Sequence, residues 1–162
     1  MSRLKNLKAS GNSCGGIVLC QIIGVPAGLG EPVFSQLDAE LAKAMLSVGA
    51  VKAIEFGAGF DFAKMDGLTS NELSKNYNGG IIGGISTGET IYFKVAVKAV
   101  PSIAMEQKAF DDSGNIISLK IRGEHDTCLI RRICPVLKAM MHLVIADFLL
   151  LQKYSTRYFE ER

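Results

Sequence analysis

The sequence has no tryptophan, almost no net charge and no long unbroken apolar run. The absence of tryptophan disfavours the aromatic platforms on which single-stranded nucleic acids stack. A formal net charge of +2 is too small to attract a nucleic acid or a membrane surface by bulk electrostatics, and leaves room only for a local charged patch. We therefore expect neither nucleic acid nor a membrane among the partners of this protein.

Patterns typical of export and of membrane insertion are also missing. Residues 1–13 are polar and charged without an apolar run behind them, which is unlike a secretory signal. The most apolar stretch, residues 136–151, is interrupted by Lys138, His142 and Asp147 and is shorter than a bilayer span. This stretch predicts a buried helix, and the two observations together predict a cytoplasmic protein.

The cysteines lack the CxxC spacing that is typical of zinc and redox sites. They lie at Cys14, Cys20, Cys128 and Cys134, and the first two would face the same side of a strand. One interpretation is a disulfide or a metal site. The other is four small, buried hydrophobic side chains in a reducing compartment, and we favour this second interpretation. No metal site is predicted.

The composition and the residue pattern predict one folded domain that contains both helices and strands. Hydrophobic residues make up 48% of the 162 residues and charged residues 21%, a balance typical of globular proteins. Periodicity and turn residues predict strands at 17–23, 51–56, 90–100 and 116–121 and helices at 33–48 and 135–153. Residues 60–78 predict a polar excursion with little core. Together these elements favour an α+β fold with a largely antiparallel sheet.

The expected boundaries are a polar leader at 1–13, a domain at 14–153 and a charged tail at 154–162 that frays. In the strand at 90–100, Ile91, Phe93, Val95 and Val97 fall on one face. The helix at 135–153 is apolar nearly all round, so we expect it to be the most buried element.

A run of five glycines lies between Gly79 and Gly88. Such a run lets the backbone approach another group closely and can point several N–H groups at an anion. It matches neither a Walker loop nor a dinucleotide-binding fingerprint, because it lacks the lysine and is followed by a predicted strand. A cradle for a phosphate or a flat cofactor is one interpretation; a tight turn or close strand packing is slightly favoured by the spacing alone.

A second polar cluster lies between Arg122 and Arg132, directly before the apolar helix. His125 or Asp126 can act in general acid–base catalysis, and the arginines can hold an anionic substrate. Alternatively, Asp126 or Thr127 caps the following helix. The chemistry favours neither interpretation. Lys98, at the end of a predicted strand, either binds a phosphate or points to solvent, and the second is favoured for a lone lysine.

Several segments together resemble the chorismate synthase family. The most extended of them reads Gly-Val-Pro-Ala-Gly-Leu-Gly-Glu-Pro-Val-Phe at residues 24–34. The others lie at 15–18, 37–42, 49–52, 79–88, 101–103 and 125–128 and in the helix through Ala146 and Asp147. The resemblance covers residues 11–153, and the order and spacing of the segments make it specific.

The resemblance implies a β–α–β sandwich with a buried C-terminal helix, a homotetramer and a lyase reaction. The family eliminates phosphate and a ring proton from 5-enolpyruvylshikimate 3-phosphate to give chorismate, and it requires reduced FMN. By position, the implied flavin contacts are Gly49, Ala50, Gly83, Lys98, Ala99, Val100, Pro101, Ser102 and Glu124. The implied proton-handling residue is Asp126.

Two departures from the family pattern lead to alternative functions. Glu124 stands where the family has an arginine, and a carboxylate repels an anion. The N-terminal part of the family chains, with two acid histidines and an arginine cluster, is expected to be absent here. We therefore expect either part of a lyase site that is inactive alone, or a non-catalytic, self-associating truncated fragment without flavin and substrate binding.

Overall fold

The centre of the fold is a three-stranded antiparallel sheet. The computed structural model describes residues 2–160, with side chains for 3–72 and 74–155. The sheet is formed by β1 (Gly16–Ile22), β5 (Ile91–Val97) and β2 (Val51–Phe56), in the order β1-β5-β2. Gly16 pairs with Val97 and Phe56 with Phe93, so the last of these three strands in the sequence lies between the two earlier ones.

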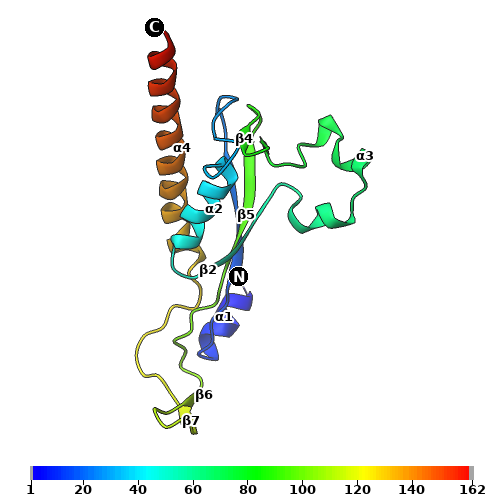
Figure 1. Ribbon diagram of the computed structural model, residues 1–162. Helices are drawn as coiled ribbons and strands as arrows, with labels where there is room; N and C mark the ends of the chain where they lie inside the picture. The colour runs from blue at the N-terminus through cyan, green and yellow to red at the C-terminus, as the bar shows by residue number, and fades with distance from the viewer. Residues whose placement is uncertain (1, 161–162) are drawn as a thin grey trace.

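Two helices, α2 (Leu37–Ser47) and α4 (Ile130–Glu160), cover one face of this sheet, as Figure 1 shows. The predicted alternation of β5 is confirmed, because Ile91, Phe93, Val95 and Val97 are each at most 4% exposed. From α2, one apolar face formed by Leu37, Leu41, Ala44 and Met45 is buried against the sheet and α4. The α+β class with antiparallel pairing is therefore confirmed.

The C-terminal helix, in contrast, is not the most buried element, and that prediction is wrong. α4 buries a single stripe formed by Ile133, Leu137, Met141 and Phe148. Among its described side chains, Ile130, Met140, Val144 and Ile145 are only partly buried against the core, and others such as Leu143 and Leu150 are exposed, because β1 and α2 cover one side of the helix. α4 also begins before the predicted start and continues through the predicted tail as far as Glu160.

The length of α4 also bears on the membrane expectation. Residues Ile130–Ser155 are long and apolar enough to cross a membrane by length and composition, with a mean hydropathy of 1.8. Core helices of soluble proteins meet the same criterion, so a single helix of this kind is weak support for a span. Only 22% of its most apolar part is buried within the described chain.

The remaining elements lie outside the sheet and its helices. α1 (Ser2–Ala9) is a short exposed helix where the sequence predicts an irregular leader. The polar excursion contains η1 (Gly59–Lys64), α3 (Gly67–Ser70) and η2 (Leu73–Lys75) and projects away from α4 (Figure 1). Two hairpins follow, β3 (Ile81–Ile82) with β4 (Ile85–Ser86) and β6 (Gln107–Phe110) with β7 (Ile116–Leu119).

The excursion leaves and rejoins the sheet at one narrow crossing. The Ala58 N–H donates to the Tyr77 carbonyl oxygen (2.7 Å), and the Gly57 N–H donates to that of Tyr92 (3.1 Å). Gly57 has a φ of 54°, and a Cβ built on it would lie 1.8 Å from the Tyr77 carbonyl oxygen. The crossing therefore needs glycine at residue 57.

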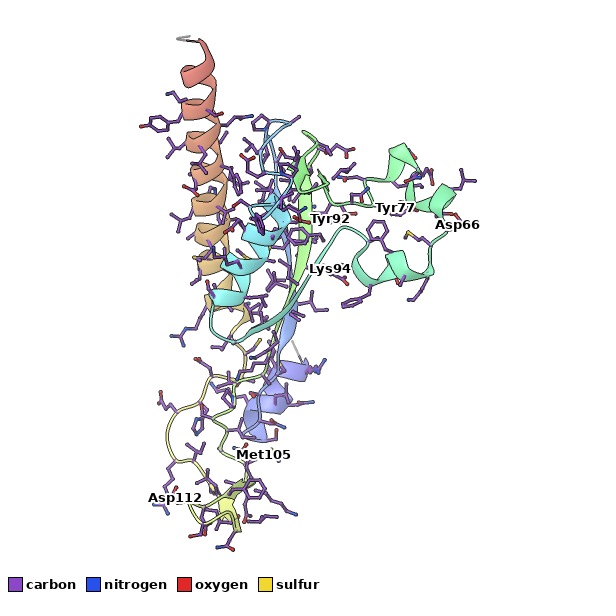
Figure 2. The ribbon with its side chains drawn as sticks, in the orientation of Figure 1. Asp66, Tyr77, Tyr92, Lys94, Met105 and Asp112 are labelled. Atoms are coloured by element: carbon purple, nitrogen blue, oxygen red, sulfur yellow. The ribbon has the colours of Figure 1, made fainter. Side chains whose placement is uncertain are left out.

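Side chains on the open face of the sheet hold the excursion in place. The Tyr92 hydroxyl donates to the carbonyl oxygen of Asn76 (3.0 Å), and Lys94 Nζ donates to Glu55 Oε1 across the β2–β5 pair (2.6 Å). Figure 2 shows Tyr92 and Lys94 on the side of β5 toward the excursion. The hydrogen bond from Lys94 lowers the pKa of the Glu55 carboxyl. The excursion is thus tied to the sheet by polar contacts and adds little to the core.

Candidate functional site

Two of the predicted cofactor segments meet where β5 ends. Gly49 and Ala50 form the turn between α2 and β2, and Ala50 has a φ of 75°. The Lys98 N–H donates to the Ala50 carbonyl oxygen (2.8 Å). This hydrogen bond places Gly49 and Ala50 beside the start of the segment Lys98, Ala99, Val100, Pro101 and Ser102. The Lys98 side chain is exposed at this end of the sheet.

Residues 11–13, which lead into β1, form hydrogen bonds with the same segment from the other side. The Ser13 hydroxyl donates to the Val100 carbonyl oxygen (2.7 Å), and the Ala104 N–H donates to that of Gly11 (3.0 Å). Because β1 and β5 run antiparallel, the start of one strand and the end of the other meet at this edge. The chain after β5 is therefore held along residues 11–13.

The loop that carries Glu124 and Asp126 joins this group through Cys14. The Cys14 N–H donates to the Thr127 carbonyl oxygen (2.9 Å), and Cys14 forms a parallel β-bridge with Cys128. Four segments that are far apart in the sequence thus converge at one end of the sheet. They contain all the predicted site residues except Gly83.

Within the loop, Asp126 makes an ion pair with α4. Arg132 Nη1 lies 2.5 Å from Asp126 Oδ2, and the Asp126 side chain is 43% exposed. α4 begins at Ile130, four residues after Asp126. The carboxylate is therefore fixed by an arginine on the first turn of the helix and remains accessible to solvent. Nε2 of the neighbouring His125 lies 3.3 Å from the Ile121 carbonyl oxygen.

A polar cavity of about 340 Å³ opens between this loop and the N-terminal helix. Its walls include Lys8, Asn12, Ala104, Glu124 and His125. A lysine and an imidazole face the same space as the Glu124 carboxylate. An arginine at residue 124 would make this cavity cationic, whereas glutamate leaves it with mixed charge.

Gly83 lies apart from the other predicted residues. It occupies the turn of the β3–β4 hairpin, exposed to solvent, near the opposite end of β5 from Lys98 (Figure 1). Next to it, Gly84 serves close packing, since its carbonyl oxygen accepts the Leu37 N–H (2.8 Å) and a Cβ there would lie 2.3 Å from Gln36 Cγ. For Gly84, the interpretation of the glycine run as a close-packing element is confirmed.

Sequence reasoning missed an apolar groove between β1 and α4. The groove has a volume of about 630 Å³, and Ile22, Met141 and Ile145 are among its lining residues. His142 also lines it, with Nδ1 2.7 Å from the Lys138 carbonyl oxygen. The apolar residues of the predicted strand at 17–23 gave a signal for one wall, but nothing in the sequence shows that α4 leaves this side of β1 open.

The cysteine interpretation needs a correction. Only Cys20 is buried, and burial, followed by the influence of Cys134, raises the pKa of its thiol to about 11. Cys14 and Cys128 are half-buried and Cys134 is exposed. The structure pairs Cys14 with Cys128, not with Cys20. Cys14 and Cys128 are 114 positions apart in the sequence (128 − 14), so no local spacing rule predicts that they lie next to each other.

Comparisons with known proteins agree with the resemblance. The family model for chorismate synthase matches residues 1–150. A chorismate synthase of Oleidesulfovibrio alaskensis is 50% identical over 159 residues, covering 94% of this chain and 45% of that protein. One of Nitratidesulfovibrio vulgaris strain DP4 is 53% identical over 156 residues, covering 93% and 44%.

A solved structure described as "Crystal Structure of Chorismate Synthase" superposes with a TM-score of 0.75 at 26% identity. The superposition covers 93% of this chain and 42% of that one. The chain spans less than half the length of the curated relatives it matches. Because the family model covers nearly the whole sequence and the fold agrees, the chain belongs to the chorismate synthase family.

Proposed function

We propose that the chain supplies part of a flavin-dependent lyase site that converts 5-enolpyruvylshikimate 3-phosphate to chorismate and phosphate. The observation that carries this proposal is the convergence of the Gly49–Ala50 turn, the segment after β5 and the Asp126 loop at one end of the sheet. We also propose a cytoplasmic location, on the basis of the polar residues 1–13 and the interrupted apolar stretch 136–151, and assembly into a homo-oligomer, as the family resemblance implies.

The residues at this end of the sheet fit a flat anionic cofactor in part. A Cβ at Gly49 would meet no heavy atom within 4 Å, so the turn offers open backbone to a ring system. The exposed ammonium of Lys98 can meet a phosphate or another anion. Glu124 does not fit an anion, because it offers only acceptors at neutral pH. When bound, reduced FMN would lend electron density that helps the substrate phosphate leave.

The protein groups at the site then have distinct roles. Lys98, with Gly49 and Ala50 beside it, binds and orients the cofactor. Asp126 handles the proton at its carboxylate, and Arg132 holds that carboxylate in one orientation while leaving it accessible. Groups outside the 162 residues are required for substrate binding, because the chain spans less than half of its relatives. The isolated polypeptide is therefore proposed to be inactive.

Flavin titration tests this assignment. We expect weak FMN binding by the chain and about tenfold tighter binding by Glu124→Arg, since a carboxylate is replaced by a forked donor of opposite charge. Glu31→Arg is the matched control, because it makes the same charge change on an exposed residue outside the cavity. Flavin fluorescence reports the affinity, and neither protein is expected to form chorismate from the substrate and reduced FMN.

The outcomes separate the parts of the proposal. Equal affinities for Glu124→Arg and the unchanged chain would show that residue 124 does not face the cofactor. Equal gains for Glu124→Arg and Glu31→Arg would show an effect of net charge alone. Measurable chorismate formation by the pure chain would show that the site is complete without further groups.

A second candidate function, a non-catalytic self-associating module, is favoured by the exposed apolar surface of α4. Leu143 is 64% exposed, and Leu149, Leu150 and Leu151 are each more than 40% exposed. Contiguous apolar surface of this kind marks an interaction site. The flavin titration distinguishes the two functions, because a module without a cofactor site gains nothing specific from Glu124→Arg.

We expect the chain to form a dimer or a larger species in solution. Leu143→Lys should shift the mass measured by light scattering toward the 17.4 kDa of a single chain, since it places a charge on the apolar surface of α4. The control is Leu68→Lys on α3, where the leucine is 88% exposed and away from this surface. A monomeric unchanged chain at high concentration would contradict the expectation.

A further inference from the structure

Cys14 and Cys128 lie in the position of a disulfide pair. They are the two partners of a parallel β-bridge, and the Cys14 N–H donates to the carbonyl oxygen of the adjacent Thr127 (2.9 Å). Neighbouring strands are about 4.8 Å apart, which lies within the Cα separation of about 4.4–6.8 Å found across disulfides. The two side chains also interact: burial, and then a hydrogen bond with the Cys128 thiol, raise the pKa of Cys14.

We propose that Cys14 and Cys128 are a redox-sensitive modification site, in which a peroxide converts the two thiols to a reversible disulfide. The peroxide first oxidises one thiol to a sulfenic acid and is reduced to water. The second thiol then attacks the sulfenic sulfur, the S–O bond breaks and a second water leaves. Two thiols and one hydrogen peroxide thus give one disulfide and two waters, and a dithiol reductant reverses the change.

Both cysteines of this pair are half-buried, so a small oxidant can reach them. The other two cysteines are less suited. Cys20 is 3% exposed, so an oxidant reaches its thiol much less readily. Exposed Cys134 therefore lacks a reactive partner among the cysteines of the chain.

The disulfide would join the entry of β1 to the loop that carries Asp126. With both thiols reduced, the β-bridge and the hydrogen bond from the Cys14 N–H to the Thr127 carbonyl oxygen connect these two segments. Cys128 is two residues from Asp126, so oxidation would restrict the motion of the loop relative to the sheet. The inference rests on the geometry of the pair and does not depend on the proposed function.

Peptide mapping after peroxide treatment tests the pair in the full chain. Trypsin releases Cys14 with Cys20 in residues 9–43, Cys128 in residues 123–131 and Cys134 in residues 133–138. We expect 9–43 linked to 123–131, two hydrogen atoms lighter than the sum of the free peptides, in protein that migrates as a single chain on a non-reducing gel. Dithiothreitol should restore both free peptides.

Three serine variants identify the sulfurs involved. Cys14→Ser and Cys128→Ser should each abolish the linked peptide, whereas Cys134→Ser should keep it. The proposal is overturned if 9–43 links to 133–138, if the linkage occurs only between two chains, or if all four cysteines of the treated protein still react with iodoacetamide.

Discussion

Phe93→Ala is expected to lower the free energy of unfolding by about 3–5 kcal/mol, the range observed when a buried phenylalanine is removed from a core. Phe93 is fully buried at the middle of β5, with its ring centroid 5.1 Å from that of Phe56. Since small domains are stable by only about 5–15 kcal/mol, this loss should bring the chain close to unfolding. Urea denaturation followed by circular dichroism measures the change.

Phe110→Ala is the matched control for this substitution. Phe110 lies on β6 and is 75% exposed, so the same truncation should change the unfolding free energy by less than about 0.5 kcal/mol. Similar values for the two variants would show that the core is not organised around β5.

Gly57→Ala is expected to cost about 2–4 kcal/mol, the sum of left-handed backbone strain and overpacking. The new methyl group would meet the backbone of Tyr77 and Gly79, which has no flexible side-chain end that could move aside. The crossing of the excursion over the sheet should therefore open. Thermal unfolding of the variant and of the unchanged chain gives the difference.

Gly114→Ala separates the two contributions. Gly114 also has a positive φ, 82°, but a Cβ there would meet nothing within 4 Å. This variant should show the backbone strain alone, about 1 kcal/mol. If Gly57→Ala costs no more than Gly114→Ala, the two backbones do not pass as closely as the structure indicates.

The local sequence pattern was sufficient to predict the elements that bury one face and expose the other. β5 alternates strictly because its two faces meet different surroundings, and α2 was found from an apolar stripe that is buried. The same reasoning failed for α4, because composition shows that a helix is apolar but not how many neighbours cover it. It missed β6, where Gln107 to Phe110 alternates too weakly to be recognised without its partner strand β7.

The candidate site was predictable only through the family resemblance. Its residues come from segments near 14, 50, 98 and 126, and their meeting depends on β5 lying between β1 and β2. Strand order is a long-range property that residue spacing does not encode. The resemblance placed Gly83 in the same cofactor site, whereas within this chain Gly83 lies in a hairpin near the far end of β5.

The position of β5 also has a consequence for how the chain is made. β1 and β2 are synthesised before β5, but they do not pair with each other, and within the described residues 2–160 each forms its strand ladder with β5 alone. Until Val97 has left the ribosome, both earlier strands expose unpaired backbone groups, a condition that promotes aggregation of nascent chains. Closing the sheet requires joining Gly16 to Val97 across a long loop, which makes folding slow relative to helical domains of similar size. During translation, the first half of this polypeptide therefore depends on a strand that has not yet been made.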